Sequence, residues 1–103
     1  MHPLIQSRLT DVADLCAKHH VRRLALFGSA TSERFDPATS DLDVLVEFQP
    51  MLPRQHADSY FGLMEDLQQL LGFPVDLVEP AAIRNPYFRQ GITQSQVVVY
   101  EAA

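Results

Sequence analysis

Residues 24–48 have the sequence LALFGSATSERFDPATSDLDVLVEF, which holds more reactive side chains at fixed spacing than any other stretch of the chain. An apolar segment ends at Gly28 and Ser29, a polar connection follows, and a second apolar segment opens with Asp41 and Asp43. The pattern predicts two strands joined by a turn and a polar loop. The chemistry of the chain is expected in this stretch.

The two apolar segments predict strands over residues 21–27 and 42–48. Side chains on a strand alternate between two faces, so the second strand has one apolar and one largely acidic face. The apolar face carries Leu42, Val44, Val46 and Phe48, and the other carries Asp41, Asp43, Leu45 and Glu47. Between the strands we expect one or two helical turns over residues 30–34, then a loop over residues 35–40.

The N-terminal segment has apolar residues at steps of three and four, which predicts a helix over about residues 3–19. Its apolar stripe consists of Leu4, Ile5, Leu9, Val12 and Cys16. Cys16 is the only cysteine and is expected to be a buried thiol. His19 and His20 are expected to be solvated helix-end residues, because adjacent residues on a helix do not face one another.

The C-terminal half begins with a predicted mobile connection over residues 49–56, which contains two prolines. A second helix is expected over about residues 58–71, with Phe61, Met64, Leu67 and Leu71 as its stripe and Gly72 as a stop signal. The order that follows is a short strand over residues 75–78, helical turns near 81–84 and 87–91, and a strand or extended tail over 96–100.

This order of elements predicts a single α/β (α+β) domain over residues 1–103. Short connections favour a small mixed sheet with helices packed on one face. The other face would stay open and would carry the carboxylates. The absence of disulfides, of an apolar run of ~20 residues and of a signal-peptide pattern leads us to expect a cytoplasmic protein without membrane attachment.

The formal net charge is −5, and the eight Lys and Arg residues are spread along the chain. A groove that follows a nucleic-acid backbone normally shows clustered basic residues. An extended DNA or RNA partner is therefore disfavoured. A nucleotide that arrives with its own metal ions remains compatible with this charge.

The acidic face suggests a metal site. Asp41 and Asp43 leave the same face of a strand with Cα atoms about 6.5–7 Å apart. Carboxylate oxygens suit Mg²⁺ or Mn²⁺, and Asp76 would complete a site for two metal ions if its strand lies beside theirs. Gly28 and Ser29 supply a turn where backbone N–H groups can cradle phosphate. Neither the Gly-Ser turn nor the Asp pair identifies an active site by itself, because such turns and solvated Asp pairs are common in proteins.

Three motifs together resemble one family. LFGSATSERFDPATSDLDVLVEF, VDLVEP and NPYFRQGITQSQVVVYE look like the pattern of the nucleotidyltransferase superfamily related to DNA polymerase beta, and more closely its minimal nucleotidyltransferase (MNT) domains. The resemblance implies a Mg²⁺-dependent transfer of a nucleoside monophosphate from an NTP, with ATP as the expected donor. It implies that Asp41, Asp43 and Asp76 are the catalytic and metal-binding acids, with Asp76 as the general base or the metal-assisted activator of the acceptor hydroxyl.

The same resemblance implies that Gly28, Ser29 and Ser40 hold the nucleotide. Small MNT proteins resemble the antitoxin half of HEPN/MNT toxin–antitoxin pairs, so the implied partner is a HEPN-domain toxin. The implied reaction adds AMP to a tyrosine of that toxin, and the chain would act as a type VII antitoxin. The sequence departs from the family pattern in two places. The spacer from Ser29 to Asp41 is one residue longer than the commonest form, and an Arg-Gly after the Gly-Ser is missing.

Two other functions stay open. The chain could be a catalytically silent antitoxin that neutralises its toxin by binding alone, although no acid of the motif is lost. It could also modify a small molecule, although 103 residues leave little room for the extra helices of such enzymes. Candidate contacts to a protein partner are Met51-Leu52 and Tyr87-Phe88.

Overall fold

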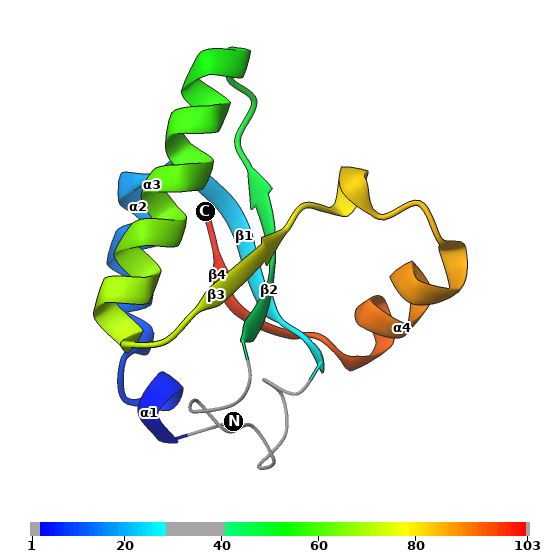
Figure 1. Cartoon of the computed structure of the whole chain (residues 1–103), viewed down its shortest axis with the longest axis horizontal. Helices are drawn as coiled ribbons and strands as arrows, with labels where there is room; N and C mark the ends of the chain where they lie inside the picture. The colour runs from blue at the N-terminus through cyan, green and yellow to red at the C-terminus, as the bar shows by residue number, and fades with distance from the viewer. Residues whose placement is uncertain (1–2, 29–40, 103) are drawn as a thin grey trace.

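A computed structural model of the chain describes residues 3–28 and 41–102. These residues form a mixed sheet with the strand order β3-β2-β1-β4 (Figure 1). The strands are β1 (Val21–Leu26), β2 (Leu42–Phe48), β3 (Val75–Val78) and β4 (Val97–Glu101). β2 is parallel to β3 and antiparallel to β1, and β1 is antiparallel to β4. The predicted fold class is confirmed, and β2 and β3 have the predicted bounds.

Two helices, α2 (Leu9–Lys18) and α3 (Pro53–Leu71), lie side by side on one face of the sheet (Figure 1). The core between these layers contains the even-numbered side chains of β2, which alternation along the strand sends to that face. Its buried members include Ile5, Val12, Cys16, Leu24, Leu26, Leu42, Val44, Val46, Leu63, Leu67, Val75 and Leu77. None of the helices in the described part of the chain is long and apolar enough to cross a membrane.

The expected single N-terminal helix is wrong, because the chain forms α1 (Pro3–Gln6) and then α2. At the break the Ser7 hydroxyl donates a hydrogen bond of 2.9 Å to the carbonyl oxygen of Leu4. The N–H of Arg8 donates to the carbonyl of Ile5, three residues back, in place of the four-residue step of an α-helix. As a result Leu4 is exposed, while Ile5 enters the core.

The predicted mobile connection over residues 49–56 is wrong in its second half, because α3 begins at Pro53. Proline is favourable at the first position of a helix, where its missing N–H has no partner to lose. The buried face follows steps of four through Ser59, Leu63, Leu67 and Leu71. Phe61, expected in the stripe, is 64% exposed. Gly72 ends the helix at a φ of 81°, as predicted.

The second face of the sheet is partly covered, which the sequence analysis did not predict. The short 3₁₀ helix η2 (Pro80–Ala82) and α4 (Pro86–Ser95) stand on this side (Figure 1). A second buried cluster joins Phe27, Ile83 and Ile92 over Leu45 and Val78 of the sheet. Asn85 and Pro86 start α4 as its cap and first residue.

The prediction of a solvated His19 is wrong. Its Nε2 lies 2.7 Å from Oδ2 of Asp66 on α3, and its side chain is only 13% exposed. Lys18 donates to the same Asp66 oxygen at 3.2 Å. A Cβ at Gly62 would come within 2.8 Å of the His19 ring, so the glycine inside α3 makes room for the histidine. His20 is exposed, as expected.

Cys16 is a buried thiol, as predicted. Its side chain is inaccessible in the core between α2 and the sheet. Burial raises the pKa of this thiol from 9.0 to about 12, because the thiolate would lose its hydration there. The group is therefore an apolar packing element and not a nucleophile at neutral pH.

The contact between α2 and α3 predicts a pH-dependent stability. Hydrogen bonds from His19 and Lys18 lower the pKa of Asp66. A lowered carboxyl pKa stabilises the folded state above the ordinary value of about 3.9, and this stability is lost as pH falls through the folded pKa. Asp66→Asn should lower the free energy of unfolding at pH 7 by up to about 1 kcal/mol.

Thermal unfolding at pH 7 and pH 3 measures this effect, with Asp58→Asn on the exposed side of α3 as the control. The difference between Asp66→Asn and wild type should shrink at pH 3. An equal difference at both pH values would show that the Asp66 carboxylate is not the stabilising group.

Candidate active site

The three predicted acids lie at one end of the parallel strand pair. Asp43 on β2 and Asp76 on β3 are register partners, and neighbouring strands are about 4.8 Å apart. Asp41 precedes β2 by one residue, where the N–H of Leu42 donates to the carbonyl oxygen of Pro74 and opens the pairing of the two strands. The sheet therefore brings together acids that are 33 residues apart in the sequence.

Asp43 is the most constrained of these acids. It is half-buried, whereas Asp41 and Asp76 are exposed. Burial raises the pKa of the Asp43 carboxyl, and the negative charges of Asp76 and then Asp41 raise it further. The three carboxylates therefore repel one another in the isolated chain, and a bound cation would relieve this repulsion.

Gly28 lies directly against Asp43. It has a φ of +65°, in the left-handed region that favours glycine. A Cβ at this position would come within 2.9 Å of Oδ2 of Asp43, 3.8 Å of its Cγ and 3.9 Å of its Cβ. Conformation and space thus both favour glycine here. Gly28 and Asp43 therefore lie side by side.

Main-chain pairing fixes this contact. The N–H of Phe27 donates to the carbonyl oxygen of Asp43 at 3.2 Å, which continues the β1–β2 ladder beyond the last residue of β1. The Phe27 side chain is buried in the second cluster, on the face that carries Asp43. The residue before the glycine is therefore held by a hydrogen bond and by packing, and the glycine follows at a fixed place.

Tyr60 is a supporting residue that the sequence analysis missed. Its hydroxyl donates a 2.7 Å hydrogen bond from α3 to the carbonyl oxygen of Leu77, the residue after Asp76. Burial raises the pKa of Tyr60, and the charges of Asp76 and Glu79 add to the rise. The sequence could not reveal this contact, because a tyrosine beside the apolar stripe of a helix does not indicate which strand its hydroxyl reaches.

Two predicted nucleotide-binding residues, Ser29 and Ser40, lie outside the described residues, as does the polar connection between them. The expected helical turns over residues 30–34 and the loop over 35–40 are in the same segment. The described part of the site consists of Gly28 and the three acids.

The donor set fits a hard divalent cation. All three acids offer carboxylate oxygens, which suit Mg²⁺ or Mn²⁺. The negative charges of Asp41 and Asp76 both act on Asp43. Within residues 3–28 and 41–102, no three His, Cys, Asp or Glu side chains already form a group that could hold a metal ion. Water and substrate phosphates usually complete a Mg²⁺ shell, so a site of this kind needs few protein ligands.

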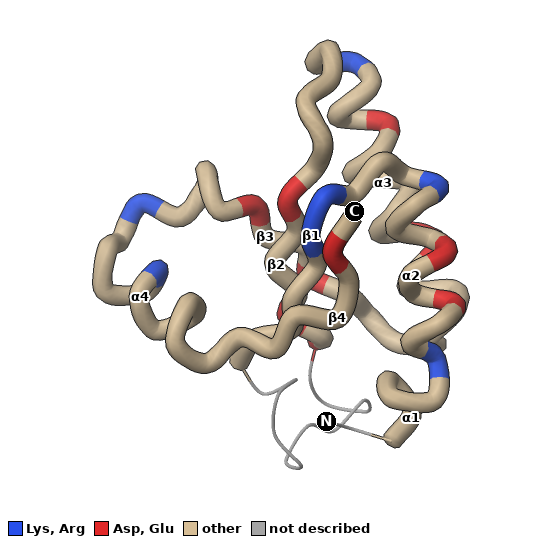
Figure 2. The backbone as a smooth tube through the Cα atoms, turned by 180° about the vertical axis from the view of Figure 1, so that it is seen from behind, with Lys and Arg blue, Asp and Glu red and all other residues tan. Residues whose placement is uncertain are grey.

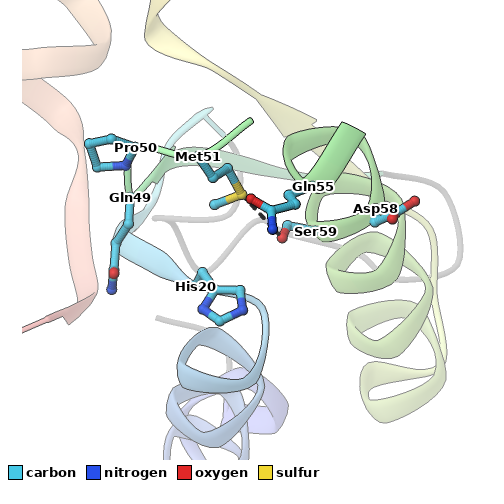
Figure 3. A pocket seen from close by; sticks show the side chains of 7 residues that line it. All are labelled: His20, Gln49, Pro50, Met51, Gln55, Asp58 and Ser59. Carbon is cyan, nitrogen blue, oxygen red and sulfur yellow. Dashed lines mark hydrogen bonds between the residues drawn. The ribbon is translucent and has the colours of Figure 1, made fainter. Parts of the chain in front are cut away.

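A cavity of about 380 Å³ lies at the opposite end of β2 (Figure 3). It is lined by His20, Gln49, Pro50, Met51, Gln55, Asp58 and Ser59, and the Ser59 hydroxyl donates to the Met51 sulfur at 3.6 Å. At about 3.3 Å per residue, Gln49 is roughly 20 Å from Asp43 along the strand. This cavity is therefore separate from the acids.

The repulsion among the acids predicts a measurable coupling. In the metal-free protein, Asp76→Asn should lower the pKa of the Asp43 carboxyl, because the charge that opposes its ionisation is removed. Carbon-detected NMR titration of the Asp43 carboxyl measures the change, with Asp58→Asn as control. An unchanged Asp43 pKa would mean that the side chains of Asp43 and Asp76 do not face one another.

Comparison with known proteins identifies the family of this chain. The family model described as "Nucleotidyltransferase domain" matches residues 12–99. A Methanocaldococcus jannaschii protein named "putative protein adenylyltransferase" is 36% identical over 83 residues, which is 80% of each chain. A solved structure described as "putative minimal nucleotidyltransferase" is 31% identical, covers 90% of each chain and superposes with a TM-score of 0.70.

More distant solved structures share the fold. A chain of a toxin–antitoxin complex with AMP-PNP is 19% identical with a TM-score of 0.69, covering 91% of this chain and 73% of that one. A chain from the tri-AMPylated Shewanella oneidensis HEPN toxin in complex with MNT antitoxin is 18% identical, with a TM-score of 0.63 and coverage of 94% and 72%. The match over residues 12–99 shows that the chain belongs to the nucleotidyltransferase domain family.

Proposed function

We propose that this chain transfers AMP from ATP, with Mg²⁺, to a hydroxyl group of a protein. The observation that carries the proposal is the contact between Gly28 and Asp43, beside Asp76 on the neighbouring strand. A turn suited to phosphate thus meets an acidic edge suited to metal ions, which is the combination that nucleotidyl transfer requires.

Each residue has a role in this proposal. Gly28, together with Ser29 and Ser40, holds the triphosphate, since no side chain at position 28 blocks its approach. Asp41 and Asp43 hold the metal ions, and Asp76 contributes as third ligand and as base. Two Mg²⁺ ions, when bound, would neutralise the phosphates and polarise the acceptor hydroxyl.

The transfer is a displacement at the α-phosphorus of ATP. The acceptor oxygen forms a bond to this phosphorus while the bond from the phosphorus to the oxygen that bridges to the β-phosphate breaks. Pyrophosphate leaves, and Asp76 takes the proton of the acceptor hydroxyl. Asp76 is suited to this role because it is exposed, whereas half-buried Asp43 sits against the turn.

The acceptor in this proposal is a tyrosine of a HEPN-domain toxin, and the chain acts as its type VII antitoxin. Support comes from the fold shared with MNT antitoxins in complexes with HEPN toxins, one of them tri-AMPylated. The name of the Methanocaldococcus jannaschii relative also points to a protein acceptor. Neutralisation by binding alone is the outcome to be separated from transfer.

Intact-mass analysis tests the proposal. The chain is incubated with ATP, Mg²⁺ and a HEPN-domain protein, which is sought in the reading frames that adjoin the gene of this chain. We expect a gain of one or more AMP units on that protein with wild type. Asp41→Asn/Asp43→Asn should reduce transfer by at least ~10³-fold, because the metal-binding charges are lost.

The control is Asp11→Asn/Asp14→Asn, which removes two acids from α2, away from the site. If wild type and the site variant both form the complex and silence the HEPN protein, and neither adds AMP, the chain is a binding antitoxin. Equal transfer by wild type and Asp41→Asn/Asp43→Asn would contradict the assigned acids.

Gly28→Ala should lower the rate of transfer at least ~10-fold, because its methyl group would displace the Asp43 carboxylate. It should also cost about 1–2 kcal/mol of stability, since alanine is strained at positive φ. Gly72→Ala is the matched control: Gly72 also has positive φ, but a Cβ there meets nothing within 4 Å. It should lose similar stability and keep its transfer rate, measured by AMP incorporation and thermal unfolding.

A further inference from the structure

Residues 80–95, here called the arm, differ in charge from the rest of the chain. They contain η2 and α4, with Arg84 and Arg89 and no acidic residue, although the chain as a whole has thirteen Asp and Glu. Figure 2 shows basic and no acidic segments along the part of the backbone that carries α4. The arm is therefore a basic surface on an acidic protein.

The arm also exposes large aromatic side chains. Tyr87 is 82% exposed and Phe88 is 53% exposed. A hollow of about 690 Å³ between η2 and α4 is lined by both arginines, with Pro86, Gln90 and Thr93 among the other lining residues. Tyrosine and arginine are among the residue types that are enriched at the hot spots of protein–protein interfaces.

Hydrogen bonds hold this surface in place. The Asn85 side chain accepts from the backbone N–H of Tyr87 at 2.9 Å and of Phe88 at 3.3 Å. Arg89 donates from Nη2 to the carbonyl oxygens of Pro80 and Ile83, which ties α4 to η2. An ordered surface loses little conformational entropy on binding, which favours affinity.

The arm lies beside the acids. The rings of Phe88 and Phe27 meet edge to face with centroids 6.4 Å apart. Phe27 is the residue before Gly28, and its N–H donates to the carbonyl oxygen of Asp43. Leu52, another exposed apolar residue, lies beyond the opposite end of β2, roughly 20 Å or more from Asp43 by strand length.

We propose that the arm is the docking surface for the acceptor protein. The acceptor presents an acidic segment to the hollow lined by Arg84 and Arg89, and an apolar contact to Tyr87 and Phe88. Docking there brings an acceptor hydroxyl to the acids that the adjoining sheet carries. This inference rests on the proposed function, because it assumes a protein acceptor.

The test is equilibrium binding without nucleotide, and the probe is a HEPN-domain protein sought in the reading frames that adjoin the gene of this chain. Tyr87→Ala/Phe88→Ala should weaken its binding at least ~30-fold, the range of interface hot spots. Arg84→Glu should weaken it at least ~10-fold, with the loss smaller at high salt. The matched controls are Phe61→Ala and Arg54→Glu, both exposed on α3, and they should bind as wild type does.

A second measurement, binding of Mg²⁺ and AMP-PNP to each variant alone, separates the proposals. Unchanged AMP-PNP binding with weakened HEPN binding supports a docking surface. Weakened AMP-PNP binding with unchanged HEPN binding would overturn it and make the aromatics a nucleobase platform. If Phe61→Ala and Arg54→Glu weakened HEPN binding as much as the arm variants, the docking proposal would also be overturned. No HEPN binding by wild type would refute docking of this acceptor, while AMP-PNP binding would leave nucleotidyl transfer standing.

Discussion

The close approach of Gly28 to Asp43 is the constraint on which the rest of the site depends. Any larger residue at position 28 would occupy the space of the carboxylate, at a positive φ that favours glycine. The contact exists because β1 and β2 pair in antiparallel register up to Phe27 and Asp43. A glycine and an acid that are 15 residues apart in sequence therefore lie side by side.

The mixed sheet extends this site to a second acid and a second layer. Parallel pairing of β2 with β3 sets Asp76 beside Asp43, while α2 and α3 bury the opposite side chains of the same strands. The acidic face is covered only in part, by the small cluster under α4. The acids therefore remain accessible on one face of the sheet, while the core fills the other face. The basic, aromatic arm lies beside the acids.

The sequence predicted most strongly where one physical rule decides the outcome. Alternation along residues 42–48 gave β2 its bounds and its faces, and the turn residue Gly72 gave the end of α3. The misses arise where a nonlocal contact overrides the local pattern. His19 is held by Asp66 of another helix. Pro53 is a different kind of miss, because the preference for proline at the first helical position is a local rule that the predicted connection did not take into account. The position of α4 depends on Ile92 packing with Phe27, which no local pattern indicates.

Paramagnetic NMR with Mn²⁺ and AMP-PNP tests most directly whether the turn and the acids form one metal–nucleotide site. The account predicts that backbone signals of Phe27, Gly28, Asp43 and Asp76 broaden beyond detection, because Mn²⁺ would lie among the carboxylates. Signals of Gln49 and Met51, at the far cavity, should persist in the same sample. Broadening centred on that cavity, with Gly28 and Asp43 unaffected, would contradict the account.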